Sequence, residues 1–535
     1  MSSFTARLVV AAGIAYLVLL YLAIPNTTYD VWGVLIVGPA AIMLGAGFVH
    51  FAFRGRFRHL RNIMYAGFAA KLVGTAFRYY VGFEAYEGGI DAARYHDYGV
   101  EAARAVWAGD LNILDIFPAG IGTAKMEGVA GLVYTFTGTS QMAGFVTFSL
   151  LAYIGIAYFV KAAVVAVPGL ADRRYAVLCI LAPSLVYWPS SIGKDAVMLL
   201  TIGIAAYALA QVMSGESVLG PLLAASAVLA LEALIRPQIV GIFVAGAFPA
   251  VMMSLLRGGP AADAAELVRR RTLFIPILLA GALGLAILSS VTVNYLDPTT
   301  DLLNPADGDE STIDSIINET ERRTAQAGSA FDPPDIGNPV MWPYAAVRTL
   351  TRPLPIEVSG IAQMFTALEM TIFLVLCLVS WRRLFNTPRL MMRNPYVLFA
   401  VITLFLLGLA FSSFANLAVL TRQKSIAFPF LLLLVCLPPL PPRRRGEDAI
   451  AAVATERARS SLVATTRRPV HDDAAEESAD TLADGQNSST SPIVSDQLGN
   501  GGMPSVHTPR QVRTGPPPGK RSTIDDIWGA PSRTV

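Results

Sequence analysis

Residues 141–164 read QMAGFVTFSLLAYIGIAYFVKAAV, and this stretch decides the class of fold. Lys161 is its single charged side chain. The hydrocarbon core of a bilayer is about 30 Å thick, and a helix needs about 20 consecutive apolar residues to cross it. We therefore predict that the stretch spans a membrane as an α-helix.

The composition of the whole chain agrees with this prediction. Of its 535 residues, 54% are hydrophobic and only 15% are charged, whereas soluble domains carry about 25% charged residues. This excludes a soluble enzyme, and the net charge of +2 gives no reason to expect nucleic acid as a partner. Cys179, Cys377 and Cys436 lie in apolar runs without paired spacing, which fits neither a disulfide framework nor a zinc site.

The sequence predicts an all-α, polytopic membrane protein with about twelve transmembrane helices. No small-residue cleavage site follows the first apolar segment, so we expect a retained helix rather than a signal peptide. The fifth segment is short, which indicates a broken or tilted helix. The predicted spans are 6–24, 31–53, 63–83, 141–164, 175–188, 195–213, 218–236, 239–256, 273–292, 360–381, 396–415 and 426–441.

The distribution of arginine predicts the orientation, because cytoplasmic loops are rich in Lys and Arg. With twelve spans, all the basic clusters fall on one side, which places both termini in the cytoplasm of a multi-pass plasma (inner) membrane protein. The clusters are Arg54, Arg56, Arg58 and Arg61; Arg173 and Arg174; Arg257 and Arg269 to Arg271; Arg382, Arg383, Arg389 and Arg393; and Arg443 to Arg445.

Two long loops then lie on the outer side of the predicted membrane domain, 1–442. Loop 84–140 is acidic but contains apolar and aromatic residues, which favours amphipathic helices at the membrane surface. Loop 293–359 is rich in Pro and Asp. The tail, 443–535, has no Phe or Tyr, so we expect it to be disordered in the cytoplasm. It offers a place for a cytoplasmic partner.

Polar residues gather at the outer ends of the predicted spans, where they mark function by default. Together with the acidic loop, separated cations on this face suit a substrate with a phosphate or pyrophosphate head group, held by Arg and Lys. For each cation alone, snorkelling to lipid head groups is the competing explanation. The residues are Arg78, the turn from Tyr187 to Asp195 with Trp188 and Lys194, Arg236, Arg422 and Lys424.

The stretch Asp91-Ala92-Ala93-Arg94-Tyr95 in the first outer loop resembles a known pattern. Polytopic GT-C glycosyltransferases, such as protein mannosyltransferases and aminoarabinose transferases, carry an Asp-Glu-x-x-Tyr-like motif there. Later landmarks of these proteins have similar counterparts in the same order. They are Ala102-Ala103, Gly109-Asp110, Pro118, Gly138-Thr139-Ser140, Ala182-Pro183-Ser184, Lys194-Asp195, Leu234 to Pro237, and Arg422 to Pro429.

This resemblance implies inverting transfer of a sugar from a polyprenyl-phosphate donor to a cell-envelope glycan or lipid acceptor. Asp91 would be the base. Ala92 replaces the second acid of the family's pair, so Asp97 is the substitute, and we expect neither a metal site nor a cofactor. Lys194, Arg236 and Arg422 would hold the phosphate. The remaining substrate-binding candidates are Tyr95 and His96 in the loop, Trp188 for stacking on a sugar ring, and Arg78, Asp195 and Lys424.

Two other functions fit the same features. An O-antigen-type repeat-unit polymerase or ligase also has about twelve spans and uses outer arginines, although the late loop here has no histidine. A flippase or transporter of a lipid-linked sugar would place charged residues near the midplane, where Lys71 and Glu369 are the candidates. A non-catalytic scaffold is supported by the tail alone.

Overall fold

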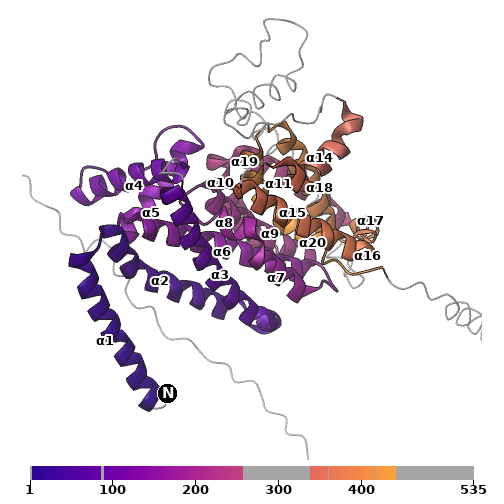
Figure 1. Cartoon of the computed structure of the whole chain (residues 1–535). Coiled ribbons are helices and arrows are strands. Elements are labelled where there is room, and N and C mark those ends of the chain that lie inside the picture. The colour runs from indigo at the N-terminus through magenta and orange to yellow at the C-terminus, as the bar shows by residue number, and fades with distance from the viewer. Residues whose placement is uncertain (1–2, 86–89, 257–337, 359–360, 415, 441–535) are drawn as a thin grey trace, which may run out of the picture. The chain divides into compact units, whose positions relative to one another are not determined.

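The computed structural model describes residues 3–85, 90–256, 338–358, 361–414 and 416–440. The chain divides into Met1–Arg443 and Arg444–Val535, and all described residues belong to the first unit. Every regular element in these ranges is a helix, so the predicted all-α class is confirmed for them (Figure 1). The predicted tail, 443–535, and the predicted span 273–292 lie outside the described residues, as does most of the late loop.

The described residues up to Leu256 form eleven α-helices. They are α1 (Ser3–Asn26), α2 (Tyr29–Ala52), α3 (Arg61–Tyr80), α4 (Asp91–Ala108), α5 (Thr123–Thr137), α6 (Gln141–Ala166), α7 (Asp172–Leu181), α8 (Pro183–Tyr187), α9 (Lys194–Ser214), α10 (Leu219–Ile235) and α11 (Pro237–Leu256). Short helices η1 (Gly55–Leu60) and η2 (Val81–Ala85) flank α3.

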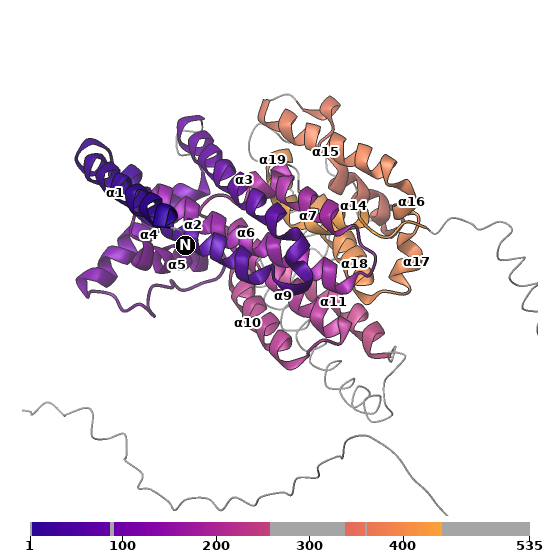
Figure 2. The ribbon, with the colours of Figure 1, turned by 90° about the horizontal axis from the view of Figure 1, so that it is seen from below.

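After the undescribed segment, 257–337, the chain continues with shorter helices and two spans. They are η3 (Pro339–Met341), α14 (Trp342–Thr351), η4 (Pro355–Glu357), α15 (Ile361–Val379), α16 (Trp381–Leu384), α17 (Thr387–Met391), α18 (Pro395–Ala410), η5 (Phe411–Ser413), α19 (Leu417–Gln423), η6 (Lys424–Ala427) and α20 (Phe428–Leu434). Figures 1 and 2 both place α15 to α17 on the side away from α1 and α2.

Six described helices are long and apolar enough to cross a membrane, and a seventh candidate is a pair bent by 73°, Met364–Val379 with Trp381–Met391. The chain is therefore a multi-pass helical membrane protein. The six are Tyr29–Ala52, Gln141–Ala166, Lys194–Ser214, Pro237–Leu256, Pro395–Ser413 and Leu417–Leu434. The apolar helices Val10–Asn26 and Leu219–Ile235 are shorter.

The last span differs from the prediction. It begins at Leu417 rather than at residue 426, because α19, η6 and α20 follow one another without a loop. The predicted spans 396–415 and 426–441 leave Arg422 and Lys424 between two helices, whereas in the structure α19 and η6 contain them. Both residues lie on helical turns inside the span, so their side chains point in different directions around one axis.

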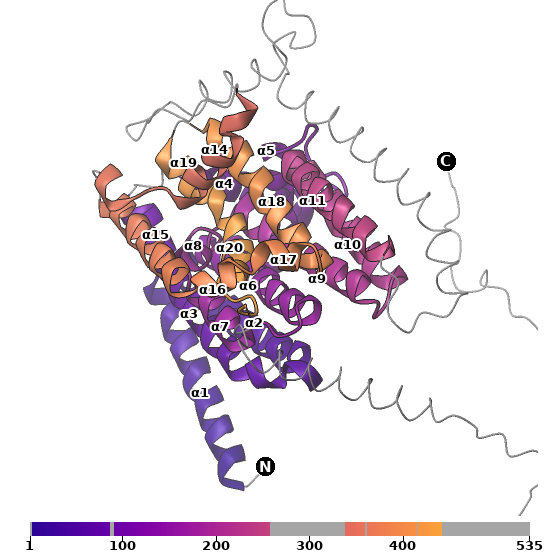
Figure 3. The same ribbon diagram turned by 90° about the vertical axis from the view of Figure 1, so that its right-hand side faces the viewer.

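α6 and α9 form the centre of the described part. Their backbones touch: a Cβ on Gly155 would lie 2.1 Å from the carbonyl oxygen of Leu199, and a Cβ on Gly203 would lie 2.3 Å from that of Gly155. Small residues that allow such contact are typical of packing between membrane helices. By contrast, α1 lies at the edge, packed on α2, with most of its described side chains exposed (Figure 3).

The predicted fifth span is a broken helix. Pro183 ends α7, because the residue before a proline is disfavoured in helical conformation, and the short helix α8 follows. Charged side chains bind both ends of α8. The amide nitrogen of Ser184 donates to Oε1 of Glu369 over 2.9 Å, and Nζ of Lys71 donates to the carbonyl oxygen of Leu185 over 2.8 Å. Each charge has the sign that the helix dipole favours.

The first predicted outer loop contains a pair of helices, α4 and α5, which pack against each other. One face of α4 is buried, with Tyr95, Gly99 and Ala102 at helical spacing, while Glu101 is exposed. Gly99 allows the close approach, since a Cβ there would lie 2.9 Å from the ring of Tyr134. The helices predicted in this loop are therefore present, and each is buried on one side.

Charged side chains lie at both ends of α9. At its C-terminal end, Arg56 and Glu216 form a bidentate pair, in which Nη2 lies 2.9 Å from Oε2. His59 and Asp172 make a neighbouring contact between η1 and α7 at 3.2 Å. At 1.5 Å per residue, a helix of 21 residues is about 31 Å long. Lys194 and the Arg56–Glu216 pair are thus separated by about the thickness of a bilayer core.

Candidate functional site

A cavity of about 270 Å³ lies at the end of α9 that begins with Lys194. The ends of α4, α5, α9 and α11 meet there with α19 and with the residue that joins α10 to α11. Its lining consists of Asp91, Arg94, Tyr95, Thr123, Lys194, Arg236, Gln238, Arg422 and Gln423. Residues separated by more than 300 positions in the sequence therefore form one polar hollow.

Helix boundaries explain how these residues reach the cavity. Asp91 is the first residue of α4, where the helix dipole favours a carboxylate, and Tyr95 follows one turn later on the same face. Lys194 is the first residue of α9. Arg236 connects α10 to α11, and Pro237 begins α11, a position that proline favours.

Asp195 is the centre of a buried ionic network beneath the cavity. Its Oδ1 accepts a hydrogen bond of 2.9 Å from Nη2 of Arg236, and its Oδ2 accepts one of 2.5 Å from Nε of Arg422. The side chains of Asp195 and Arg236 are only 4% and 6% exposed. Both carboxylate oxygens are therefore occupied, and the carboxylate fixes the direction of both guanidinium groups.

Arg422 bridges this network to the proposed base. Its Nη1 donates to Oδ2 of Asp91 over 2.5 Å. In contrast to the buried Asp195, the side chain of Asp91 is 58% exposed, and that of Arg422 is 25% exposed. Asp91 is thus an accessible carboxylate held beside the cations.

Lys194 supplies a third cation. Its Nζ donates to Oγ1 of Thr123 over 2.9 Å. Within the described ranges, no carboxylate lies within ion-pair distance of this ammonium. Arg236 and Arg422 share the carboxylate of Asp195, and Arg422 also binds that of Asp91, so Lys194 is the cation of this group without an ion pair in the described ranges.

Tyr95 forms a neutral wall of the cavity. Its side chain is buried, and burial, followed by the nearby Asp91 carboxylate, raises the pKa of Tyr95 to about 12. The phenol therefore stays protonated at neutral pH. The ring lies close to Gly193, where an added Cβ would be 4.0 Å from Cε2 of Tyr95.

Arg94 reaches the rim of the cavity from α4, and its Nε donates to Oε1 of Glu127 over 2.7 Å. Gln423 lies deeper, where its Oε1 accepts a bond of 2.7 Å from Nη1 of Arg236. Sequence reasoning missed Arg94, Thr123, Gln238 and Gln423 as lining residues. Gln238 and Gln423 stand within two positions of predicted cations, which was a usable signal, whereas Thr123 had none.

Other predicted site residues lie outside the cavity lining. Asp97 is exposed on α4, and His96 turns toward α5, where its Nδ1 lies 2.7 Å from the hydroxyl of Tyr134. Burial lowers the pKa of His96. Lys424 is 0% exposed and donates to the carbonyl oxygen of Arg352 instead.

Arg78 and Trp188 form a separate cluster with Tyr187. Nη1 of Arg78 donates to the Tyr187 hydroxyl over 2.9 Å, and its guanidinium lies 4.8 Å and 5.3 Å from the ring centroids of Tyr187 and Trp188. The cavity therefore brings together six predicted residues, counting the buried one beneath it. They are Asp91, Tyr95, Lys194, Asp195, Arg236 and Arg422.

No family model, curated protein or solved structure matches this chain. The function has to be argued from the geometry.

The cavity combines two chemical capabilities. Arg and Lys donors are suited to a phosphate or another oxyanion, and an accessible carboxylate is suited to accepting a proton. Among the described residues, no group of three or more His, Cys, Asp or Glu side chains is arranged to hold a metal ion.

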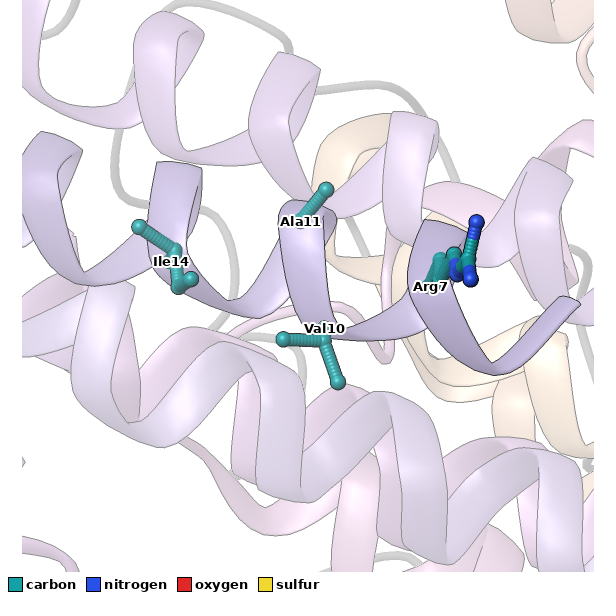
Figure 4. A pocket seen from close by; sticks show the side chains of 4 residues that line it. All are labelled: Arg7, Val10, Ala11 and Ile14. Carbon is teal, nitrogen blue, oxygen red and sulfur yellow. The ribbon is translucent and has the colours of Figure 1, made fainter. Parts of the chain in front are cut away.

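A second hollow lies on α1 and has a different character. Arg7, Val10, Ala11 and Ile14 line it along one face of that single helix (Figure 4). Apart from Arg7, its surface is apolar, and polar groups from several elements do not converge on it. We assign the candidate site to the polar cavity.

Proposed function

We propose that the protein is a membrane glycosyltransferase of the GT-C type. It transfers a sugar from a polyprenyl-phosphate donor to a cell-envelope glycan or lipid acceptor at the outer face of the plasma membrane. The proposal includes about twelve spans, both termini in the cytoplasm, and the cavity at the outer side.

The observation that carries this proposal is one cavity lined by an accessible carboxylate and by four cations, three of which are proposed to hold the phosphate. Asp91 lies 2.5 Å from Arg422, and Arg236 and Lys194 line the same hollow. At about 270 Å³ the cavity lies near the lower limit of ligand sites. This size suits the polar head of a lipid substrate, with the hydrocarbon chain left in the membrane.

The chemistry follows from these charges. Asp91 accepts the proton of the acceptor hydroxyl, and the hydroxyl oxygen forms a bond to the anomeric carbon of the donor sugar. The bond between that carbon and the phosphate oxygen breaks, and its electron pair leaves with the phosphate. Lys194, Arg236 and Arg422 stabilise the negative charge that develops on the leaving oxygen.

The proposed orientation rests on the arginine-rich loop that lies near the C-terminal end of α9. The basic cluster at Arg56 lies at one end of this helix and the cavity at the other. Because arginine-rich ends favour the cytoplasm, the cavity end is proposed to face outward.

The midplane charges give no support to a flippase. Lys71 and Glu369 both bind α8, through its backbone and the hydroxyl of Ser184, and neither lines the polar cavity. Their contacts stabilise a helix break, which gives them a structural role.

The test uses the purified full chain in lipid nanodiscs with a radiolabelled polyprenyl-phosphate sugar and a cell-envelope lipid extract as acceptor. We expect a new glycosidic product from the wild type and none from Asp91→Asn. Glu101→Gln is the matched control, since it removes an exposed acid from the same helix.

Three results would contradict the proposal. Full product formation by a folded Asp91→Asn variant would remove Asp91 as the base. Movement of label across liposomes without a new bond would indicate a flippase. Product formation only from a pyrophosphate-linked oligosaccharide would instead favour the polymerase class.

A further inference from the structure

We propose that the ion pair between Asp91 and Arg422 is a latch that the donor phosphate opens. The phosphate takes the place of Asp91 on Arg422, and Asp91 is free to act as a base only once the donor is bound. This inference rests on the proposed function and adds an order of events to it.

One half of the latch is fixed. Nε of Arg422 is held by Oδ2 of Asp195 over 2.5 Å, and the other oxygen of Asp195 is bound to Arg236. Because Asp195 is 4% exposed, breaking these contacts would leave charge buried without a partner, which is costly. The guanidinium of Arg422 therefore stays anchored while its outer edge remains directed at the cavity.

The other half can be exchanged. Asp91 is 58% exposed and borders the cavity, so water can solvate its carboxylate when the contact breaks. Ion pairs between exposed groups contribute only about 0–1 kcal/mol. A phosphate oxygen is also an acceptor for the same guanidinium edge, so it can replace the carboxylate oxygen without loss of a hydrogen bond.

The surrounding charge favours this exchange. Lys194 binds a neutral hydroxyl, Thr123, and has no carboxylate partner among the described residues. An anion on Arg422 lies in the same cavity as this ammonium and as Arg236. An incoming phosphate therefore gains attraction from Lys194, which has no ion pair with Asp91 among the described residues.

The latch imposes an order on the reaction. Oδ2 of Asp91 accepts a hydrogen bond from Nη1 of Arg422, so this oxygen is not available to an acceptor hydroxyl while the contact is made. Once the phosphate has displaced it, the carboxylate is close to the bound donor and can accept a proton. Donor binding thus precedes activation of the acceptor.

The test measures binding of farnesyl phosphate to the purified full chain by calorimetry. If the contact costs about 1 kcal/mol to break, Asp91→Asn should bind this probe about fivefold more tightly than wild type. Glu101→Gln, which removes an equal charge from the same helix, should leave the dissociation constant unchanged.

An Arg422→Lys background separates the latch from a simple charge effect. Lysine keeps the positive charge but lacks the second edge that joins Asp195 to Asp91, so Asp91→Asn should have no effect on binding there. An equal gain in both backgrounds would overturn the latch, and so would no gain in the single variant or failure of every variant to bind the probe.

Product formation is measured separately with the same proteins. Tighter binding in Asp91→Asn without any sugar transfer by the wild type would support the latch and contradict the proposed function. Sugar transfer by the wild type, with no change in probe binding for Asp91→Asn, would support the proposed function and contradict the latch.

Discussion

Replacing Asp195 by alanine tests whether the two arginines of the cavity depend on one buried carboxylate. The change removes two charge-assisted hydrogen bonds, of 2.9 Å to Arg236 and 2.5 Å to Arg422. Bonds to charged groups contribute about 1.5–3 kcal/mol each. For the bond to Arg422 we take the lower value of this range, because the Arg422 side chain is 25% exposed and keeps Asp91 as a partner.

The expected loss of unfolding free energy is therefore about 3–5 kcal/mol, the range for a broken buried ion pair. Most of it comes from Arg236, which is 6% exposed and would keep hydrogen bonds from its guanidinium to Gln423 and to the sulfur of Met198. Asp195→Asn retains one acceptor oxygen, so we expect it to lose about half as much, ~2 kcal/mol.

The assay is unfolding of the detergent-solubilised protein by titration with SDS, followed by far-ultraviolet circular dichroism. Glu101→Gln, an exposed acid on α4, is the control and should be unchanged. A double variant, Asp195→Leu with Arg236→Met, removes the charge from both sides of one contact, and we expect it to recover stability relative to Asp195→Ala. A loss below about 1 kcal/mol in Asp195→Ala, the value for an exposed pair, would refute the buried network.

Three further predictions concern separate features. Lys194→Met should weaken farnesyl phosphate binding by about tenfold or more, because the charge-assisted bond between the ammonium and the phosphate is lost. Unchanged affinity in calorimetry would exclude Lys194 from the anion site. Burial lowers the pKa of His96, so the unfolded chain binds a proton at a higher pH than the folded chain does. The folded state should therefore be fully stable above pH ~6.5 and lose stability as the pH falls below that value. Melting temperatures of wild type and His96→Gln at pH 8 and 5.5 check this, and an equal drop in melting temperature for both proteins would contradict it. Gly155→Ala should sharply lower stability in the SDS assay, since its Cβ would lie 2.1 Å from a carbonyl oxygen of α9, whereas Gly13→Ala has nothing within 4 Å and should be tolerated.

The class of fold and several of the residues that line the cavity were predictable, because bilayers impose simple rules on sequence. An apolar run such as 141–164 has few alternatives to a spanning helix. Lys194 and Arg236 stood out because charge near the ends of apolar segments is unusual, and Asp91 stood out through the resemblance of its motif. Their convergence could not be predicted, because it depends on which helix ends meet in space.

The direction in which a side chain points around its helix axis was the main thing that the sequence could not predict about the site. Arg422 and Lys424 are two positions apart and were predicted to share a role, but only Arg422 lines the cavity, while Lys424 is buried against the Arg352 carbonyl. Asp195 was predicted to touch substrate, yet both of its oxygens are occupied by arginines. Thr123 belongs to a short loop-flanked helix, and nothing in its neighbourhood distinguished it.

The charged caps of α8 have a consequence for biosynthesis. Lys71 is made before Leu185, so the carbonyl end of α8 meets its partner as soon as it enters the bilayer. The amide of Ser184 meets Glu369 only 185 residues later, which takes about 10–40 s at typical translation rates of about 5–20 residues per second. During that interval the break between α7 and α8 depends on water or on the insertion machinery for its missing partner. A nascent chain that stops before α15 would hold α8 by one end alone.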